Sequence, residues 1–118
     1  MIPTLTIQQR IEYETQYEAL RQSQQAIESV WRDLQANQSV SCMREIPQTV
    51  LPEHILATND IGQDLLKAAT EINDSIVLWR AECQNPRPNP PSIVIDDGLR
   101  LALSAEQTLI KIEQNLRQ

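Results

Sequence analysis

Two pairs of carboxylates have a spacing that could support metal chemistry. Asp60 and Asp64 lie four residues apart, and Glu71 and Asp74 lie three apart, so each pair shares one face if this part of the chain is helical. Carboxylates one turn apart on facing helices can hold magnesium or iron. One hypothesis is therefore a metal-dependent all-α nucleotide hydrolase that uses the carboxylates of this helix.

The companions that such a metal site needs are missing. A di-iron site requires Glu-x-x-His motifs, and the sequence contains none. A magnesium cluster would need a second acidic pair from another helix. Glu14 and Glu18 have the spacing, but the apolar pattern around them places both beside the core. Charged faces opposite an apolar stripe explain these acids, and we predict no metal and no cofactor.

The one histidine, His54, and the two cysteines, Cys42 and Cys83, also could do chemistry. Cys42 with His54 lacks an acidic group to orient the imidazole, and three residues without a close ligand pair do not form a structural zinc site. Phosphotransfer through His54 is disfavoured because it follows Pro52 in a connector. We interpret His54 as a surface residue, and we expect both cysteines to be free thiols because the chain has no export signal.

The prolines define the elements that must position these residues. Long proline-free stretches allow uninterrupted helices, and we predict them at about 6–36, 59–84 and 95–117. A connector at 37–58 contains a short helix that starts at Pro52, and it is long enough to run along the bundle. A stiff proline-rich linker covers 85–91, and Pro88–Pro91 in it matches the minimal PxxP spacing. The prolines are Pro3, Pro47, Pro52, Pro86, Pro88, Pro90 and Pro91.

Each predicted long helix carries apolar residues that alternate four and three positions apart, which is typical of a bundle seam. Gln24 interrupts the first seam as a polar layer, and Gly62 suggests a close approach of another backbone. Leu66, Ala68 and Val77 widen the second stripe, and Leu99, Leu103 and Ile110 flank the third. The seams are Tyr13, Tyr17, Leu20, Ile27, Trp31 and Leu34; Leu65, Ala69, Ile72, Ile76, Trp79 and Cys83; and Ala102, Ala105, Leu109, Ile112 and Leu116.

The charge of the chain limits the classes of partner that it can bind. The net charge is −6, with acids and bases interspersed, so no basic stripe is available for phosphates or anionic lipid. No apolar run approaches the roughly 20 residues of a membrane span, and Met1–Arg10 lacks the features of a signal peptide. We expect no direct nucleic-acid partner, no membrane contact and a cytoplasmic location.

We therefore predict an all-α protein with one domain at 1–118. Three long helices and a short connector helix form an up-down helical bundle, which is completed by self-association. The predicted function is a non-enzymatic α-helical protein interaction or adaptor module that acts through its coiled-coil-like apolar seams. Partners are a second copy of the chain or another protein. A further alternative is an acidic regulator or inhibitor that occupies a basic partner. The candidate interaction residues are Tyr13, Tyr17, Trp31, His54 and Trp79.

Overall fold

The computed structural model describes residues 5–56, 59–85 and 90–117, apart from the side chain of Leu56. The predicted all-α class is confirmed, since this part of the chain forms helices and no strand. The described residues form four helices, which are α1 (Ile7–Gln35), α2 (Glu53–Leu56), α3 (Asp60–Gln84) and α4 (Ser92–Leu116). None of the described helices is long and apolar enough to cross a membrane.

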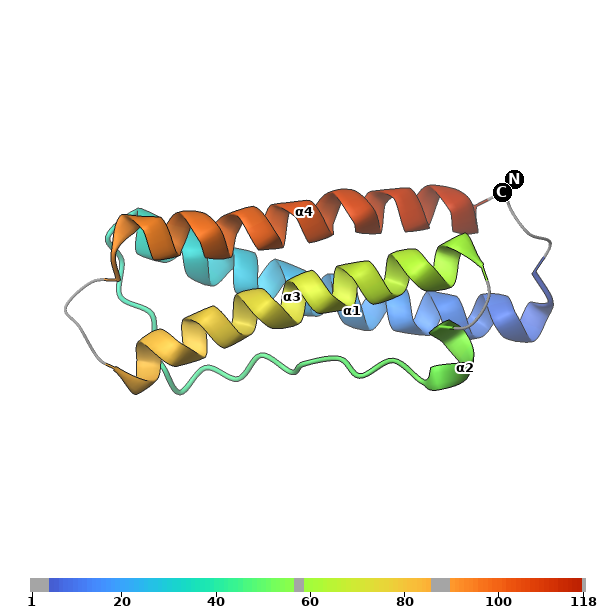
Figure 1. Ribbon diagram of the computed structural model, residues 1–118, viewed down its shortest axis with the longest axis horizontal. Helices are drawn as coiled ribbons and strands as arrows, with labels where there is room; N and C mark the ends of the chain where they lie inside the picture. Colours follow the sequence, from blue (N-terminus) through green and yellow to red (C-terminus); the bar gives the residue numbers. More distant parts are fainter. Residues whose placement is uncertain (1–4, 57–58, 86–89, 118) are drawn as a thin grey trace.

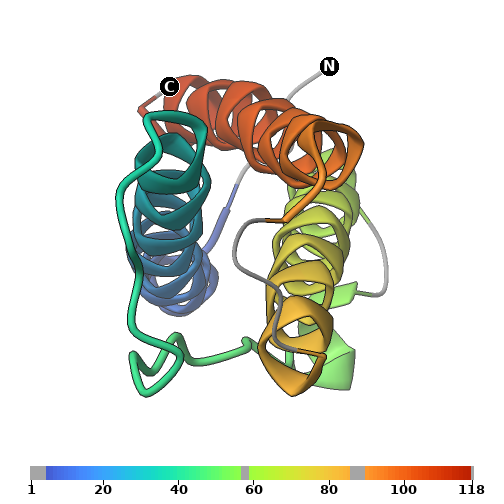
Figure 2. The same ribbon diagram turned by 90° about the vertical axis from the view of Figure 1, so that its left-hand side faces the viewer.

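The three long helices form an elongated bundle about 51 Å in length. α1 and α3 run in the same direction, and α4 runs in the opposite one (Figure 1). The chain returns from the end of α1 to the start of α3 along the length of the bundle. Viewed from the end, α4 covers one side of the α1–α3 pair and the returning segment covers the other (Figure 2). An extended connector therefore takes the position of a fourth helix.

The long helices begin and end where local chemistry satisfies their terminal groups. Thr6 and Gln9 form a capping box, with both hydrogen bonds at 3.0 Å. Asn37 has a positive φ of 60° and ends α1 in a Schellman arrangement, in which the Asn37 and Gln38 amides donate to the Leu34 and Asp33 carbonyls. The Asn59 side chain accepts from the Gly62 amide at the start of α3.

α4 begins at Ser92, earlier than the predicted start at residue 95. Pro91 precedes the first turn with φ −59° and ψ 148° and without a side-chain cap. The linker residues 86–89 lie outside the described residues, and so do the first two residues of the Pro88–Pro91 motif.

The predicted seams form the core of the bundle, with Leu34 and Cys83 only partly buried. The widening of the stripes is confirmed in part: Ala68 and Leu99 are buried and Leu103 packs against the core, whereas Leu66, Val77 and Ile110 are exposed. α4 and the returning segment leave the outer faces of α1, α3 and α4 uncovered, and these three side chains lie there. The seams are therefore closed within the chain.

A buried hydrogen-bond relay joins all three long helices. Trp31 Nε1 on α1 donates to Ser75 Oγ on α3 at 2.8 Å, and Ser75 Oγ donates to the Gly98 carbonyl on α4 at 2.8 Å. Gly98 is required here, because a Cβ atom at this position would overlap the Trp31 ring. The predicted polar layer is also present: Gln24 Nε2 donates to the Ala102 carbonyl at 2.9 Å. These bonds satisfy polar groups that would be costly to bury unpaired.

We call residues 38–52 the strap. It lies over α1 and α3, opposite α4, and buries Ile46 and Leu51. Three strap carbonyls accept hydrogen bonds from helix side chains. Ser23 Oγ donates to Pro47 at 2.8 Å, Asn73 Nδ2 to Thr49 at 3.1 Å, and an Arg80 guanidinium nitrogen to Ile46 at 3.3 Å. After the strap, the Ile55 carbonyl lies so close to Gly62 that a Cβ atom there would overlap it, as the sequence predicted.

The prediction of free thiols is wrong, because Cys42 and Cys83 form a disulfide with their Cα atoms 5.7 Å apart. The path of the chain explains the bond. α1 and α3 run in the same direction, so the start of the strap lies at the end of the bundle where α3 ends (Figure 1). Cys42 follows α1 by a few residues, and Cys83 lies in the last turn of α3. Their separation of 41 residues hides this proximity in the sequence.

Candidate functional site

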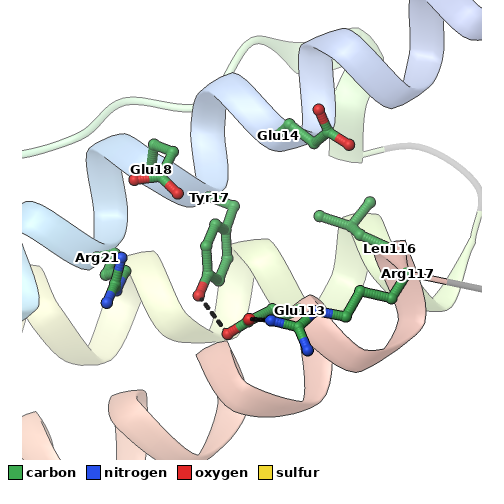
Figure 3. Close-up of a pocket in the computed structure, with 7 residues that line it drawn as sticks. All are labelled: Glu14, Tyr17, Glu18, Arg21, Glu113, Leu116 and Arg117. Atoms are coloured by element: carbon green, nitrogen blue, oxygen red, sulfur yellow. Dashed lines mark hydrogen bonds and ion pairs between the residues drawn. The ribbon is translucent and has the colours of Figure 1, made fainter.

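A groove follows the line where α1 meets α4, on the side of α1 away from the strap. It consists of two adjoining hollows of about 320 and 200 Å³ that share Tyr17, Arg21 and Glu113. Figure 3 shows the larger hollow, with Glu14 and Glu18 on the α1 side and Glu113, Leu116 and Arg117 on α4. We call this the α1/α4 groove, and its lining is Glu14, Tyr17, Glu18, Arg21, Gln24, Gln25, Glu106, Leu109, Ile110, Glu113, Leu116 and Arg117.

Carboxylates outnumber guanidinium groups in the α1/α4 groove. Four glutamates face two arginines, and Ile110 adds an exposed apolar side chain. Glu14, Glu18 and Glu106 form no ion pair with another described residue. Side chains like these can pair with the cationic groups of a partner, and an apolar neighbour strengthens the attraction by lowering the local dielectric.

Glu113 organises the floor of the groove. Its carboxylate accepts a hydrogen bond from Tyr17 Oη at 2.9 Å and pairs with the Arg117 guanidinium of the next turn (Figure 3). Burial raises the pKa of the Tyr17 hydroxyl above its ordinary value of 10.0, and the hydrogen bond to Glu113 raises it further. Tyr17 is therefore a neutral donor at physiological pH, and it fixes the Glu113 side chain.

The five candidate interaction residues occupy three different places. Tyr13, Trp31 and Trp79 are buried in the core, and Tyr13 Oη accepts a hydrogen bond from Asn59 Nδ2 at 2.7 Å. Tyr17 lines the α1/α4 groove. His54 lies on α2, exposed as interpreted from the sequence, with Nε2 2.9 Å from Glu12 Oε2 on α1. The structure therefore does not bring these five residues together as one surface.

The carboxylates of α3 that could serve a metal site are dispersed. Asp60 and Asp74 are exposed. Asp64 lies 3.3 Å from Lys111 Nζ of α4, an ion pair that compensates its enclosed oxygen although the two are not aligned as a hydrogen bond. Glu71 is half-buried, and its Oε1 has no hydrogen-bond partner among the described residues. Within residues 5–56, 59–85 and 90–117, no three His, Cys, Asp or Glu side chains form a group that could hold a metal.

The groove residues follow a signal that the sequence analysis missed. On α1 the sequence positions one residue after the seam carry Glu14, Glu18, Arg21 and Gln25. On α4 the same offset gives Glu106, Ile110, Glu113 and Arg117. Both series repeat the four-three spacing of the seam, so each forms a stripe along its helix beside the packed face. Two such stripes become a groove once α1 and α4 are known to be neighbours.

The lining of the groove consists of carboxylates, guanidinium groups, amides and a tyrosine beside aliphatic side chains, and these described residues include no Ser, Cys or His. No family model, curated protein or solved structure matches this chain. The functional argument therefore rests on the geometry and charge of the chain itself.

Proposed function

We propose that the protein is a non-enzymatic α-helical interaction module that binds a basic partner protein through the α1/α4 groove. The observation that carries the proposal is the acidic majority of the groove beside exposed Ile110. The partner segment that fits has lysine or arginine next to an apolar residue. An extended helix-lined groove of this kind accepts an amphipathic segment.

We assign partner binding to the α1/α4 groove and not to the apolar seams. Tyr13, Trp31 and Trp79 are already covered by their own chain, so a partner reaches the outer faces of the helices and not the seams. Self-association remains a prediction, and it is an alternative to the basic partner as occupant of the groove. A second copy would meet the groove with a net charge of −6, so mutual repulsion favours a basic partner over a second copy.

The cytoplasmic location also remains a prediction. Free thiols were expected as a consequence of that location, so the Cys42–Cys83 disulfide argues against it. Oxidising compartments preserve such bonds, whereas the cytosol reduces them. Blocking free thiols at the moment of lysis and measuring the fraction of disulfide-bonded chain would distinguish the two locations.

Two matched charge reversals test the groove. Glu14→Lys with Glu18→Lys changes its α1 side, and Asp60→Lys with Asp74→Lys changes exposed positions of α3. Each pair raises the net charge from −6 to −2, because each substitution adds two charges. Immobilised wild-type protein and both variants are used to capture partners from lysate, followed by elution with about 0.5 M salt, at which surface electrostatics are strongly screened.

The expected result is a basic protein that binds the wild type and the α3 variant, is lost with the groove variant, and elutes with salt. An equal loss of capture by both variants would show that overall charge, and not the groove, attracts the partner, and undiminished capture by both would contradict the groove as the binding site. Light scattering on the unbound protein measures self-association separately. A dimer that the groove variant disrupts would identify the second copy as the occupant and contradict the basic partner.

A further inference from the structure

The strap is attached to the bundle at few points. Ile46 is the one buried side chain between Ser41 and Val50, and Met43 and Val50 are 86% and 89% exposed. None of the backbone amides at 45–51 donates a hydrogen bond to the backbone of another described residue. The strap thus has no secondary structure of its own, and its position depends on the helices beneath it.

An apolar surface lies under the strap. Ser23 of α1 and Asn73 of α3 donate hydrogen bonds to strap carbonyls, which identifies the helix faces that meet it. Val30 lies two turns after Ser23 on the same face, and Ala69 and Ile76 lie one turn to either side of Asn73. These three side chains are buried. Displacement of the strap would expose them to solvent.

The covalent attachment of the strap is open to chemical attack. Cys42 is exposed and Cys83 is only half-buried. Thiol–disulfide exchange requires access of a thiolate to one sulfur, and the exposure of Cys42 provides it. A dithiol reductant can therefore break the S–S bond. It donates two electrons and two protons, leaves Cys42 and Cys83 as thiols, and becomes a disulfide itself.

We propose that the Cys42–Cys83 disulfide is a redox-sensitive latch that holds the strap over the α1–α3 pair. Reduction by a dithiol frees the first part of the strap and uncovers the apolar surface beneath it. The bundle itself stays folded, because the Trp31–Ser75–Gly98 relay and the seam of α4 lie on the other side of α1 and α3. The latch does not depend on the proposed function, since the α1/α4 groove contains no strap residue.

Trypsin provides a local probe, because Arg44 is the one lysine or arginine between Asp33 and Leu66. Oxidised and dithiothreitol-reduced protein are digested in parallel, and cleavage is followed by mass spectrometry. Cleavage after Arg44 should be at least about tenfold faster in the reduced protein, because proteolysis follows the population of the open segment. Cleavage after Arg21 and Arg32 in α1 should not change.

Further measurements make each outcome decisive. Cys42→Ser and Cys83→Ser should match the reduced wild type and not respond to dithiothreitol. The reduced protein should also bind the dye 8-anilinonaphthalene sulfonate, and oxidation should reverse both changes.

An unchanged rate of cleavage after Arg44 would show that the disulfide does not hold the strap. Faster cleavage at Arg21 and Arg32 in step with Arg44 would show that reduction unfolds the bundle, and would overturn a local latch. The comparison of oxidised with reduced wild-type protein tests the latch even if a serine variant fails to fold.

Discussion

α4 and the strap cover opposite sides of the same helix pair by different means. α4 buries a continuous seam and shares the Trp31–Ser75–Gly98 relay with its neighbours. The strap buries Ile46 and Leu51, accepts hydrogen bonds from helix side chains at three of its carbonyls, and is linked to α3 by a disulfide. Burying a side chain of this size contributes about 1.5–3 kcal/mol, whereas ordering the backbone costs about 1–2 kcal/mol per residue. A covalent bond is the natural substitute where a seam is absent.

The same substitution on the two sides should have the larger effect on the α4 side. Ser75→Ala leaves the buried Trp31 Nε1 without its acceptor and removes the second hydrogen bond of the Gly98 carbonyl, which keeps its bond within α4, so we expect a loss of about 2–3 kcal/mol in the free energy of unfolding. Ser23→Ala removes the donor to the Pro47 carbonyl. Water can replace that donor because Pro47 is exposed, and the expected loss is about 0.5–1 kcal/mol.

Urea denaturation measures the free energy of unfolding of the two variants. If this free energy depends equally steeply on urea concentration in both, stability alone has changed. The wild type is the common reference, and both variants are kept oxidised. If Ser23→Ala cost as much as Ser75→Ala, the strap would be as firmly integrated as α4, and the contrast between the two sides would be wrong.

A smaller effect is expected at the α1/α4 groove. Tyr17→Phe removes the hydrogen bond to Glu113 and should cost about 1 kcal/mol near neutral pH, since the site is partly open to water. The pKa of Tyr17 is raised on folding by burial and by Glu113. Its stabilising contribution is therefore complete below about pH 10, the pKa of an unfolded tyrosine, and disappears as the pH rises through the folded-state pKa.

Spectrophotometric titration of the wild type and the Tyr17→Phe variant isolates the Tyr17 signal as a difference. Urea denaturation at neutral pH and above pH 10 then follows the stability gap between them. The gap should narrow at high pH. A gap that stays constant, or a Tyr17 pKa below its ordinary value, would contradict the hydrogen bond between Tyr17 and Glu113.

The helices were predictable from the sequence because their signals are local. The Thr6–Gln9 capping box, the four-three seams and the polar layer at Gln24 each depend on residues within a few turns. Leu66, Val77 and Ile110 could not be placed correctly, since exposure at the edge of a stripe depends on which neighbour covers it. A bundle whose fourth position is filled by an extended strap needs a narrower apolar face than one built from four helices.

The candidate site depended on information that a single helix does not carry. The stripes that contain Glu18 and Glu113 are visible in the sequence, but their meeting requires the order and direction of α1 and α4. The Cys42–Cys83 bond likewise required the parallel course of α1 and α3. Both features combine residues that are far apart in the chain. They depend on the course of the chain between these residues and not on a local sequence pattern.

The contrast between the two sides of the bundle is tested most directly by ¹⁵N–¹H correlation spectra of the oxidised and the dithiothreitol-reduced protein. The account predicts chemical-shift changes confined to the strap, the two cysteines and the residues that contact the strap, such as Ser23, Asn73 and Arg80. The Trp31 indole signal and the amides of α4 should stay in place, because the relay through Ser75 does not involve the strap. Loss of dispersion throughout α4, or no change in the strap, would contradict it.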